Sequence, residues 1–244
     1  MKTTDKKTKS FRITLIVVAV IIPATLIFMW KFADRQFYLS SVIIMILAMV
    51  PVFARFERKQ PHAREIVTLA VMCAIAVIGR IAFIMVPNFS PILGIIMITG
   101  MALGPQSGFI CGVISAFVSN FFFGQGPWTP WQMFAFGLGG LLMGLLVKKR
   151  HNGKILLNPE KRLTVSIVGA VMIMVLIGPL LDTGTVFIMS SMIGDSSILA
   201  IYVAGIPINA IHAAATFLTL LVLCRPMCEK LDRIKVKYGI MNEI

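Results

Sequence analysis

The stretch from Phe121 to Phe136 decides the fold, and it reads Phe-Phe-Phe-Gly-Gln-Gly-Pro-Trp-Thr-Pro-Trp-Gln-Met-Phe-Ala-Phe. One apolar run leads into it and another leads out of it. Its middle cannot continue a helix, because Gly124 and Gly126 free the backbone while Pro127 and Pro130 each fix φ and remove an N–H donor. The stretch therefore predicts a rigid turn between two membrane spans.

The side chains of this turn suit either a binding pocket or a membrane anchor. Trp128 and Trp131 present large rings with polar tips, and Gln125 and Gln132 add amide donors and acceptors. Such a set can line a small-molecule pocket. It is equally typical of the aromatic belt at the lipid–water boundary, where Trp collects. The turn alone leaves both interpretations open.

The composition is far from that of a soluble domain. Of the 244 residues, 58% are hydrophobic and only 14% are charged, with a mean hydropathy of +0.91. These values predict an all-α fold, a polytopic membrane helical bundle. The formal net charge of +13 fits a basic cytoplasmic face next to anionic lipid. Nucleic-acid binding is not expected, because no platform of interleaved basic and aromatic residues lies on that face.

Hydropathy divides the chain into a core and an N-terminal pair of helices. About eight apolar spans are expected, at residues 11–30, 37–53, 66–86, 91–103, 107–123, 131–147, 163–189 and 198–223. The predicted organisation is a cytoplasmic tail at 1–10, an N-terminal helical pair at 11–56, a cytoplasmic linker at 57–65, a six-span core at 66–228 and a cytoplasmic tail at 229–244.

The count of spans depends on a break at Gly104-Pro105-Gln106. Residues 91–123 are apolar over a length too great for one untilted span, and Gly-Pro punctuates them. Without the break, the loop at 148–162 would lie outside the cell with its six basic residues. The positive-inside rule therefore favours the break, with both termini cytoplasmic in a multi-pass plasma-membrane protein.

Charged side chains inside membrane spans are costly and mark functional sites. Arg80 and Asp182 are the two expected within spans, both in the outer half, where they could pair with each other, face an outward pocket, or do both. Asn88 and Asn120 lie at a similar depth. Asn209 and His212 are three residues apart, so they share one face of the last span, nearer the middle of the membrane. A lone His on an apolar helix is more often a buried, satisfied group than a ligand.

Other patterns exclude several classes of chemistry. No Gly-x-x-x-x-Gly-Lys-Ser/Thr loop, His-Glu-x-x-His helix or Gly-x-Ser-x-Gly elbow occurs. The four Cys form no Cys-x-x-Cys pair, so neither a disulfide framework nor a metal site is expected. No cofactor is predicted either. Ala70 and Ala74 form a small-xxx-small pair, which permits close approach of another helix, from this chain or from a partner.

Taken together, these residues resemble the substrate-binding S component of energy-coupling factor (ECF) vitamin transporters. The resemblance covers roughly Arg64 to Cys228 as six spans. It includes the Ala70/Ala74 pair, the short second core helix after Pro91, and the Phe-Gly-Gln-Gly-Pro-Trp-Thr-Pro-Trp-Gln turn at 123–132. The turn resembles that of a subgroup of S components, some of them linked to cobalamin uptake. The extra spans at 11–53 depart from the six-span pattern.

The resemblance implies a binding and translocation subunit rather than an enzyme. A vitamin or vitamin precursor, with cobalamin weakly favoured, would bind in an outward pocket, while a membrane coupling component and two cytosolic ATPases would drive import. Ala70 and Ala74 would contact the coupling component, and the loop at 87–91 would gate the pocket. The expected substrate-binding residues are Arg80, Asn88, Gln125, Trp128, Trp131, Gln132, Asp182, Asn209 and His212.

Two other functions stay open from the residues. A stand-alone secondary transporter would move protons through Asp182 and His212. A membrane-embedded enzyme would use Asp182, Arg80 and His212, although the expected difference in depth between His212 and the other two argues against one catalytic cluster.

Overall fold

The computed structural model describes residues 63–147, 159–189 and 196–238, with a few isolated positions nearer the N-terminus. The described part is all helical, as the composition predicts. Its elements are α4 (Ala63–Ala82), α5 (Ile92–Leu103), α6 (Pro105–Phe123), α7 (Thr129–Leu146), α8 (Pro159–Met172), the π-helical η2 (Ile173–Ile177), α9 (Gly178–Met189) and α10 (Ser196–Tyr238). The predicted N-terminal tail and helical pair and the loop at 190–195 lie outside the described residues.

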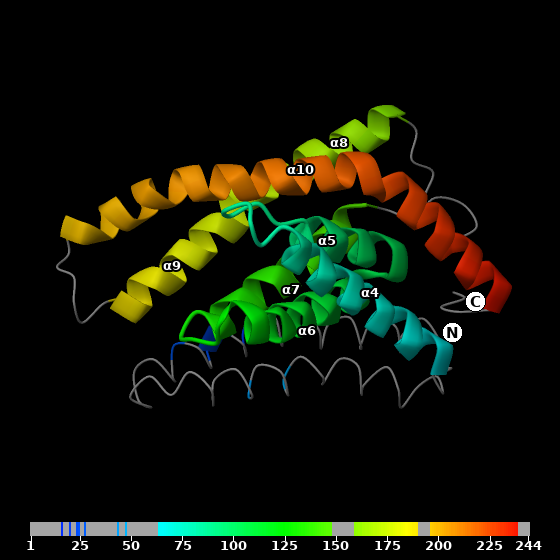
Figure 1. Cartoon of the computed structure of the whole chain (residues 1–244), viewed down its shortest axis with the longest axis horizontal. Coiled ribbons are helices and arrows are strands. Elements are labelled where there is room, and N and C mark those ends of the chain that lie inside the picture. Colours follow the sequence, from blue (N-terminus) through cyan, green and yellow to red (C-terminus); the bar gives the residue numbers. More distant parts are fainter. Residues whose placement is uncertain are drawn as a thin grey trace.

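Apolar helices occupy the stretches where the sequence predicts the membrane spans of the core. Five described helical segments are long and apolar enough to cross a membrane, and α5 is a shorter apolar helix between two of them. Figure 1 shows α10 running across the bundle, with α4 to α7 gathered beneath it, α9 beside its first half and α8 above it. The polypeptide is therefore a polytopic helical bundle.

The break between α5 and α6 lies where the Gly-Pro signal places it. Gly104 has a φ of 105°, a conformation that suits glycine, and Pro105 begins the next helix. All residues of α5 are buried, and the helix packs against α4, α6, α7 and α10. At about 18 Å, α5 is too short to cross the hydrocarbon alone, so this enclosure is what makes a short apolar helix acceptable.

Glycines let the backbones of α5, α6 and α7 touch. A Cβ on Gly100, Gly108 or Gly140 would collide with the main chain of the neighbouring helix. Small residues at such contacts are the usual means of close packing between membrane helices. The turn between α6 and α7 therefore joins two helices in direct backbone contact, and its position is fixed by both.

The expected span at 163–189 is helical throughout but contains a wider turn. Pro179 has no N–H to donate, and its ring crowds the carbonyl of Val175 one turn earlier. The π-helical turn η2 ends at Ile177, two residues before this proline, and such turns relieve this kind of crowding. Gly178, at the start of α9, is buried and faces the last helix.

The last helix is longer than the expected span at 198–223. It continues to Tyr238, about 65 Å from end to end. Beyond Leu223 it keeps a buried side that includes Cys228 and Leu231, and Lys235 donates to Asp232 at 2.6 Å. Its end meets the start of α4, where the Arg64 guanidinium lies over the Tyr238 ring. A basic sequence therefore continues the helix here, because one of its faces remains covered.

Candidate functional site

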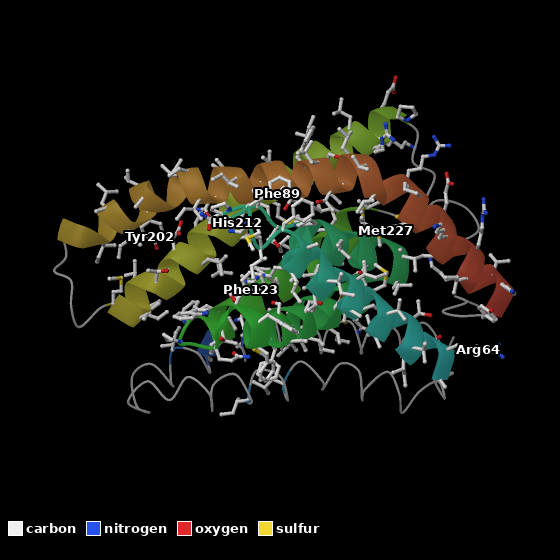
Figure 2. All side chains as sticks on the ribbon, viewed as in Figure 1. Arg64, Phe89, Phe123, Tyr202, His212 and Met227 are labelled. Atoms are coloured by element: carbon white, nitrogen blue, oxygen red, sulfur yellow. The ribbon has the colours of Figure 1, made fainter. Side chains whose placement is uncertain are left out.

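A cavity of about 390 Å³ lies beneath the loop that joins α4 to α5. Its walls come from this loop and from the facing parts of α4, α5, α6, α7, η2, α9 and α10. Figure 2 shows His212 of α10 and Phe89 of the loop near the centre of the bundle, with Phe123 at the end of α6 below them, and all three line the cavity.

Five of the nine expected binding residues line this cavity. They are Arg80, Asn88, Gln132, Asn209 and His212. They come from α4, the α4–α5 loop, α7 and α10, so only the tertiary fold brings them together. The rest of the wall is mainly apolar and includes the rings of Phe83, Phe89, Phe123 and Phe136.

Arg80 is held at the cavity by neutral partners on α6. Its Nη1 donates to Ser119 Oγ at 2.6 Å and to Asn120 Oδ1 at 3.0 Å. The guanidinium also lies 4.3 Å from the centroid of the Phe123 ring, in cation–π geometry. These contacts use the Nη1 donors of the guanidinium and leave other N–H groups of Arg80 for a ligand.

Asn120 connects Arg80 to the turn at 124–128. It is fully buried, and its Nδ2 donates to Thr129 Oγ1 at 3.1 Å and to Gln132 Oε1 at 2.8 Å. Thr129 in turn donates to Gln125 Oε1, while Gln125 Nε2 donates to the Phe117 carbonyl at 3.0 Å. The turn is therefore one end of a hydrogen-bond network whose other end is the cavity cation.

Asp182 and Asn209 form a second polar contact, between α9 and α10. Asn209 Nδ2 donates to Asp182 Oδ2 at 2.8 Å. Two glycines make room for it: a Cβ on Gly205 would lie 2.5 Å from Asp182 Oδ2, and one on Gly178 would collide with the Asn209 amide. Arg80 and Asp182 thus have different partners, and no ion pair joins them within the described residues.

The α4–α5 loop covers the cavity with a strained residue and an unsatisfied hydroxyl. Asn88 has a φ of 59°, in the left-handed region that Asn tolerates better than most residues. Ser90 is 8% exposed, and its Oγ has no hydrogen-bond partner among the described residues. The Phe83 and Phe89 rings pack 5.1 Å apart, while Met85 is 90% exposed.

Gln125, Trp128, Trp131 and Asp182 are not part of the cavity wall. Gln125 holds the turn and Asp182 holds Asn209, as described above. Trp128 is 44% exposed and folds over Gly126, whereas Trp131 stacks on Phe187 of α9 with 5.3 Å between the ring centroids. The turn therefore presents its indoles to its own backbone and to a neighbouring helix.

The expected difference in depth does not keep His212 away from Arg80. His212 and Arg80 line the same cavity, although counting along their spans places them at different levels. Counting residues along a span does not show at what angle the helix crosses its neighbours, nor how a break such as η2 displaces the residues that follow. Within the described ranges, no three His, Cys, Asp or Glu side chains gather as metal ligands would.

Two contributors to the site, Ser90 and Asn120, were not among the nine expected binding residues. Ser90 reads as an ordinary loop serine, and the sequence contains no signal for its burial. Asn120 was a better candidate, because a carboxamide late in an apolar span needs partners there. The aromatic walls were also missed, since Phe is common in every span of this chain.

Ala70 and Ala74 are exposed on the side of α4 that faces away from the other described helices. Val67, Val71 and Ile78, which share this side at helical spacing, are also exposed. Within the described part of the chain, no helix packs on Ala70 and Ala74, so that part does not support the interpretation that the pair serves internal packing. The outer side of α4 is a smooth, apolar stripe.

Comparison with known proteins assigns the family. Residues 61–228 match the family described as the S component of the ECF-type riboflavin transporter. The chain belongs to this family of S components. Proteins of this family are described as the S components of membrane transporters, not as enzymes. The match does not single out the cobalamin-type subgroup.

Similar curated proteins cover part of this S component. A UPF0397 protein of Vibrio atlanticus (strain LGP32) is 28% identical over 95 residues, which is 37% of this chain and 52% of the relative. Another, of Aliivibrio salmonicida (strain LFI1238), is 29% identical over 96 residues, 36% of this chain and 52% of that protein. The chain thus spans about half the length of the curated relatives it matches. No solved structure matches it.

Proposed function

We propose that this S component captures a flavin such as riboflavin in the cavity beneath the α4–α5 loop and delivers it inward with a membrane coupling component and two cytosolic ATPases. The family description names riboflavin, and the cavity provides a place for it. The observation that carries the proposal is the combination of an apolar, aromatic cavity with buried polar groups that face it.

The composition of the wall suits a planar heterocycle. Binding pockets combine apolar walls with a few fixed polar groups, and this cavity has four Phe side chains together with Arg80, Gln132 and Asn209. The unpartnered, buried hydroxyl of Ser90 supports the same conclusion, because such a group costs stability unless a ligand or water satisfies it.

Cavity volume favours a flavin over a corrinoid. The 390 Å³ lies near the lower end of the range for ligand pockets, about 300–1,000 Å³. A flavin ring system fits that size, whereas a corrinoid with its nucleotide loop is several times larger. Cobalamin, the ligand weakly favoured by the turn sequence, would need the α4–α5 loop to move away from the cavity.

The exposed stripe on α4 is the proposed contact with the membrane coupling component. Ala70 and Ala74 permit a partner helix to approach closely, and no described helix of this chain covers them. We place the protein in the plasma membrane with both termini in the cytoplasm, as the charge distribution favours.

The binding step is tested by titrating the purified full-length protein with riboflavin and following the flavin fluorescence. Quenching is expected, because the ring enters an aromatic cavity, and excess cobalamin or thiamine should not restore the signal. Ser90→Ala should weaken binding about three- to tenfold, the usual range for one neutral hydrogen bond.

Ser166→Ala is the matched control. Ser166 is a buried serine on α8 whose hydroxyl donates to the Arg162 carbonyl, and it does not line the cavity. This variant should bind riboflavin within about twofold of the unaltered protein. Absence of riboflavin binding, or its displacement by cobalamin, would contradict the proposed ligand.

A further inference from the structure

Two amides on the cavity wall are each connected by hydrogen bonds to a charged residue, one to a basic residue and the other to an acidic one. Gln132 is linked through Asn120 to Arg80, and Asn209 is bonded directly to Asp182. Asn120 and Asp182 do not line the cavity, so they cannot touch a ligand in it directly. Their effect on a ligand has to pass through the two amides.

On the α7 side the chain of hydrogen bonds leaves a donor. A guanidinium can only donate, so it is the carbonyl oxygen of Asn120 that faces Arg80. The Asn120 amino group then faces Gln132 and donates to Oε1. Gln132 Nε2 is left without a hydrogen-bond partner among the described residues, and it is a donor.

On the α10 side the hydrogen bond leaves an acceptor. The amino group of Asn209 donates to the Asp182 carboxyl oxygen, so the amide oxygen of Asn209 points elsewhere. Asn209 is 6% exposed and lines the cavity, and its Oδ1 has no hydrogen-bond partner among the described residues. The amide lies flat against Gly178, where a side chain would displace it.

We propose that Arg80 and Asp182 set the hydrogen-bond polarity of the cavity, so that Gln132 and Arg80 present donors to the ligand while Asn209 presents an acceptor. Asn120 and Asp182 are the positioning residues of this arrangement. If the Asn209 amide turned over, it would lose its hydrogen bond to Asp182. If the Gln132 amide turned over, it would lose its hydrogen bond to Asn120, which Arg80 orients.

This polarity selects one edge of the ligand, an inference that rests on the proposed function. Complementary chemistry is a carbonyl acceptor next to an N–H donor, which is what a cyclic imide provides. In the flavin ring system the imide N–H is the sole ring donor, and carbonyls flank it. The imide edge would therefore face Arg80 and Gln132 with its carbonyls and Asn209 with its N–H.

The test compares riboflavin with riboflavin methylated at the imide nitrogen, which keeps both carbonyls and loses the donor. The unaltered full-length protein should bind riboflavin about tenfold or more tightly than the methylated compound. Equal affinities for the two would overturn the proposal. Failure to bind riboflavin at all would instead overturn the proposed function, and this inference with it.

Two variants separate the donor side from the acceptor side. Asn209→Ala should bind the two flavins within about twofold of each other, because the acceptor that distinguishes them is gone. Gln132→Glu replaces the donor by an acceptor and should weaken both flavins about tenfold, with their ratio unchanged. Parallel weakening of both flavins in Asn209→Ala, with the ratio kept, would show a merely structural role and overturn the assignment.

The positioning role of Asp182 has its own readout. In Asp182→Ala the Asn209 amide has no preferred orientation, so only about half of the molecules would present its oxygen to the ligand. The preference for riboflavin over the methylated compound should therefore fall about twofold or more. Thr183→Val is the control, since it removes the hydrogen bond to Tyr202 in the same helix contact without touching Asn209. An unchanged ratio in Asp182→Ala, or an equal fall in Thr183→Val, would overturn this role.

Discussion

Asn88 holds the loop above the cavity in a backbone conformation that few residues accept. Its φ of 59° is tolerated by Asn or Gly, but a β-branched residue there is strained by about 1–3 kcal/mol. Asn88→Val should therefore loosen the loop and speed release of bound flavin, as measured by the dissociation rate. Asn88→Gly keeps the conformation but also removes the amide, so it isolates the contribution of the side chain. Equal dissociation rates in both variants would argue against loop strain as the cause.

Replacing Trp128, in contrast, should have almost no effect on riboflavin binding. Because its ring covers Gly126 and is 44% exposed, Trp128→Ala should change riboflavin affinity by less than about twofold. A fluorescence titration measures this directly. A loss of on the order of 1–3 kcal/mol, the value for an aromatic ring stacked on a heterocycle, would return Trp128 to the binding role that the sequence suggested.

At this scale the sequence indicates which side chains are unusual for their position, but not where they point. Arg80, Asn209 and Asp182 stand out because polar groups inside apolar spans are costly. Whether such a group lines a cavity or supports one that does depends on neighbours from other helices. The serine at position 90 gives no such signal, since a loop hydroxyl costs nothing until the fold buries it.

Backbone contact between α5, α6 and α7 makes individual glycines irreplaceable. Gly140 faces the main chain of Gly108, whereas the nearest atom to a Cβ on Gly139 would be 3.5 Å away. Gly140→Ala should destabilise the protein by about 1–3 kcal/mol through overpacking, and Gly139→Ala should be tolerated. Thermal unfolding in detergent compares the two. Similar midpoints would contradict the close packing described here.

Among the elements, breaks in helices were easier to predict than their ends. Gly104-Pro105 interrupts an apolar run and has a single structural meaning, so the short α5 could be expected. The π-helical η2 could not, because Pro179 is compatible with a kink, a wider turn or a helix end. The length of α10 was missed because its charged segment after Arg225 reads as a tail, and only packing shows that one face is covered.

For the whole molecule, the proposed coupling stripe predicts a separation of binding from transport. Ala70→Trp combined with Ala74→Trp should leave riboflavin affinity unchanged and abolish uptake by cells that contain the ATPase partners, because bulk on this face blocks close helix approach. The matched control is Ala210→Trp with Ala214→Trp, an exposed pair of the same spacing on α10. Equal loss of uptake in both double variants would show that the stripe on α4 has no special role.

The central claim is that the cavity beneath the α4–α5 loop holds a flavin. Mass spectrometry of the small molecules retained by the purified protein tests it most directly, with Leu181→Trp, which fills the cavity wall, as the comparison. The account predicts a flavin in the unaltered protein and its absence from Leu181→Trp. A corrinoid or another class of molecule in the unaltered protein, or a flavin retained equally by both, would contradict it.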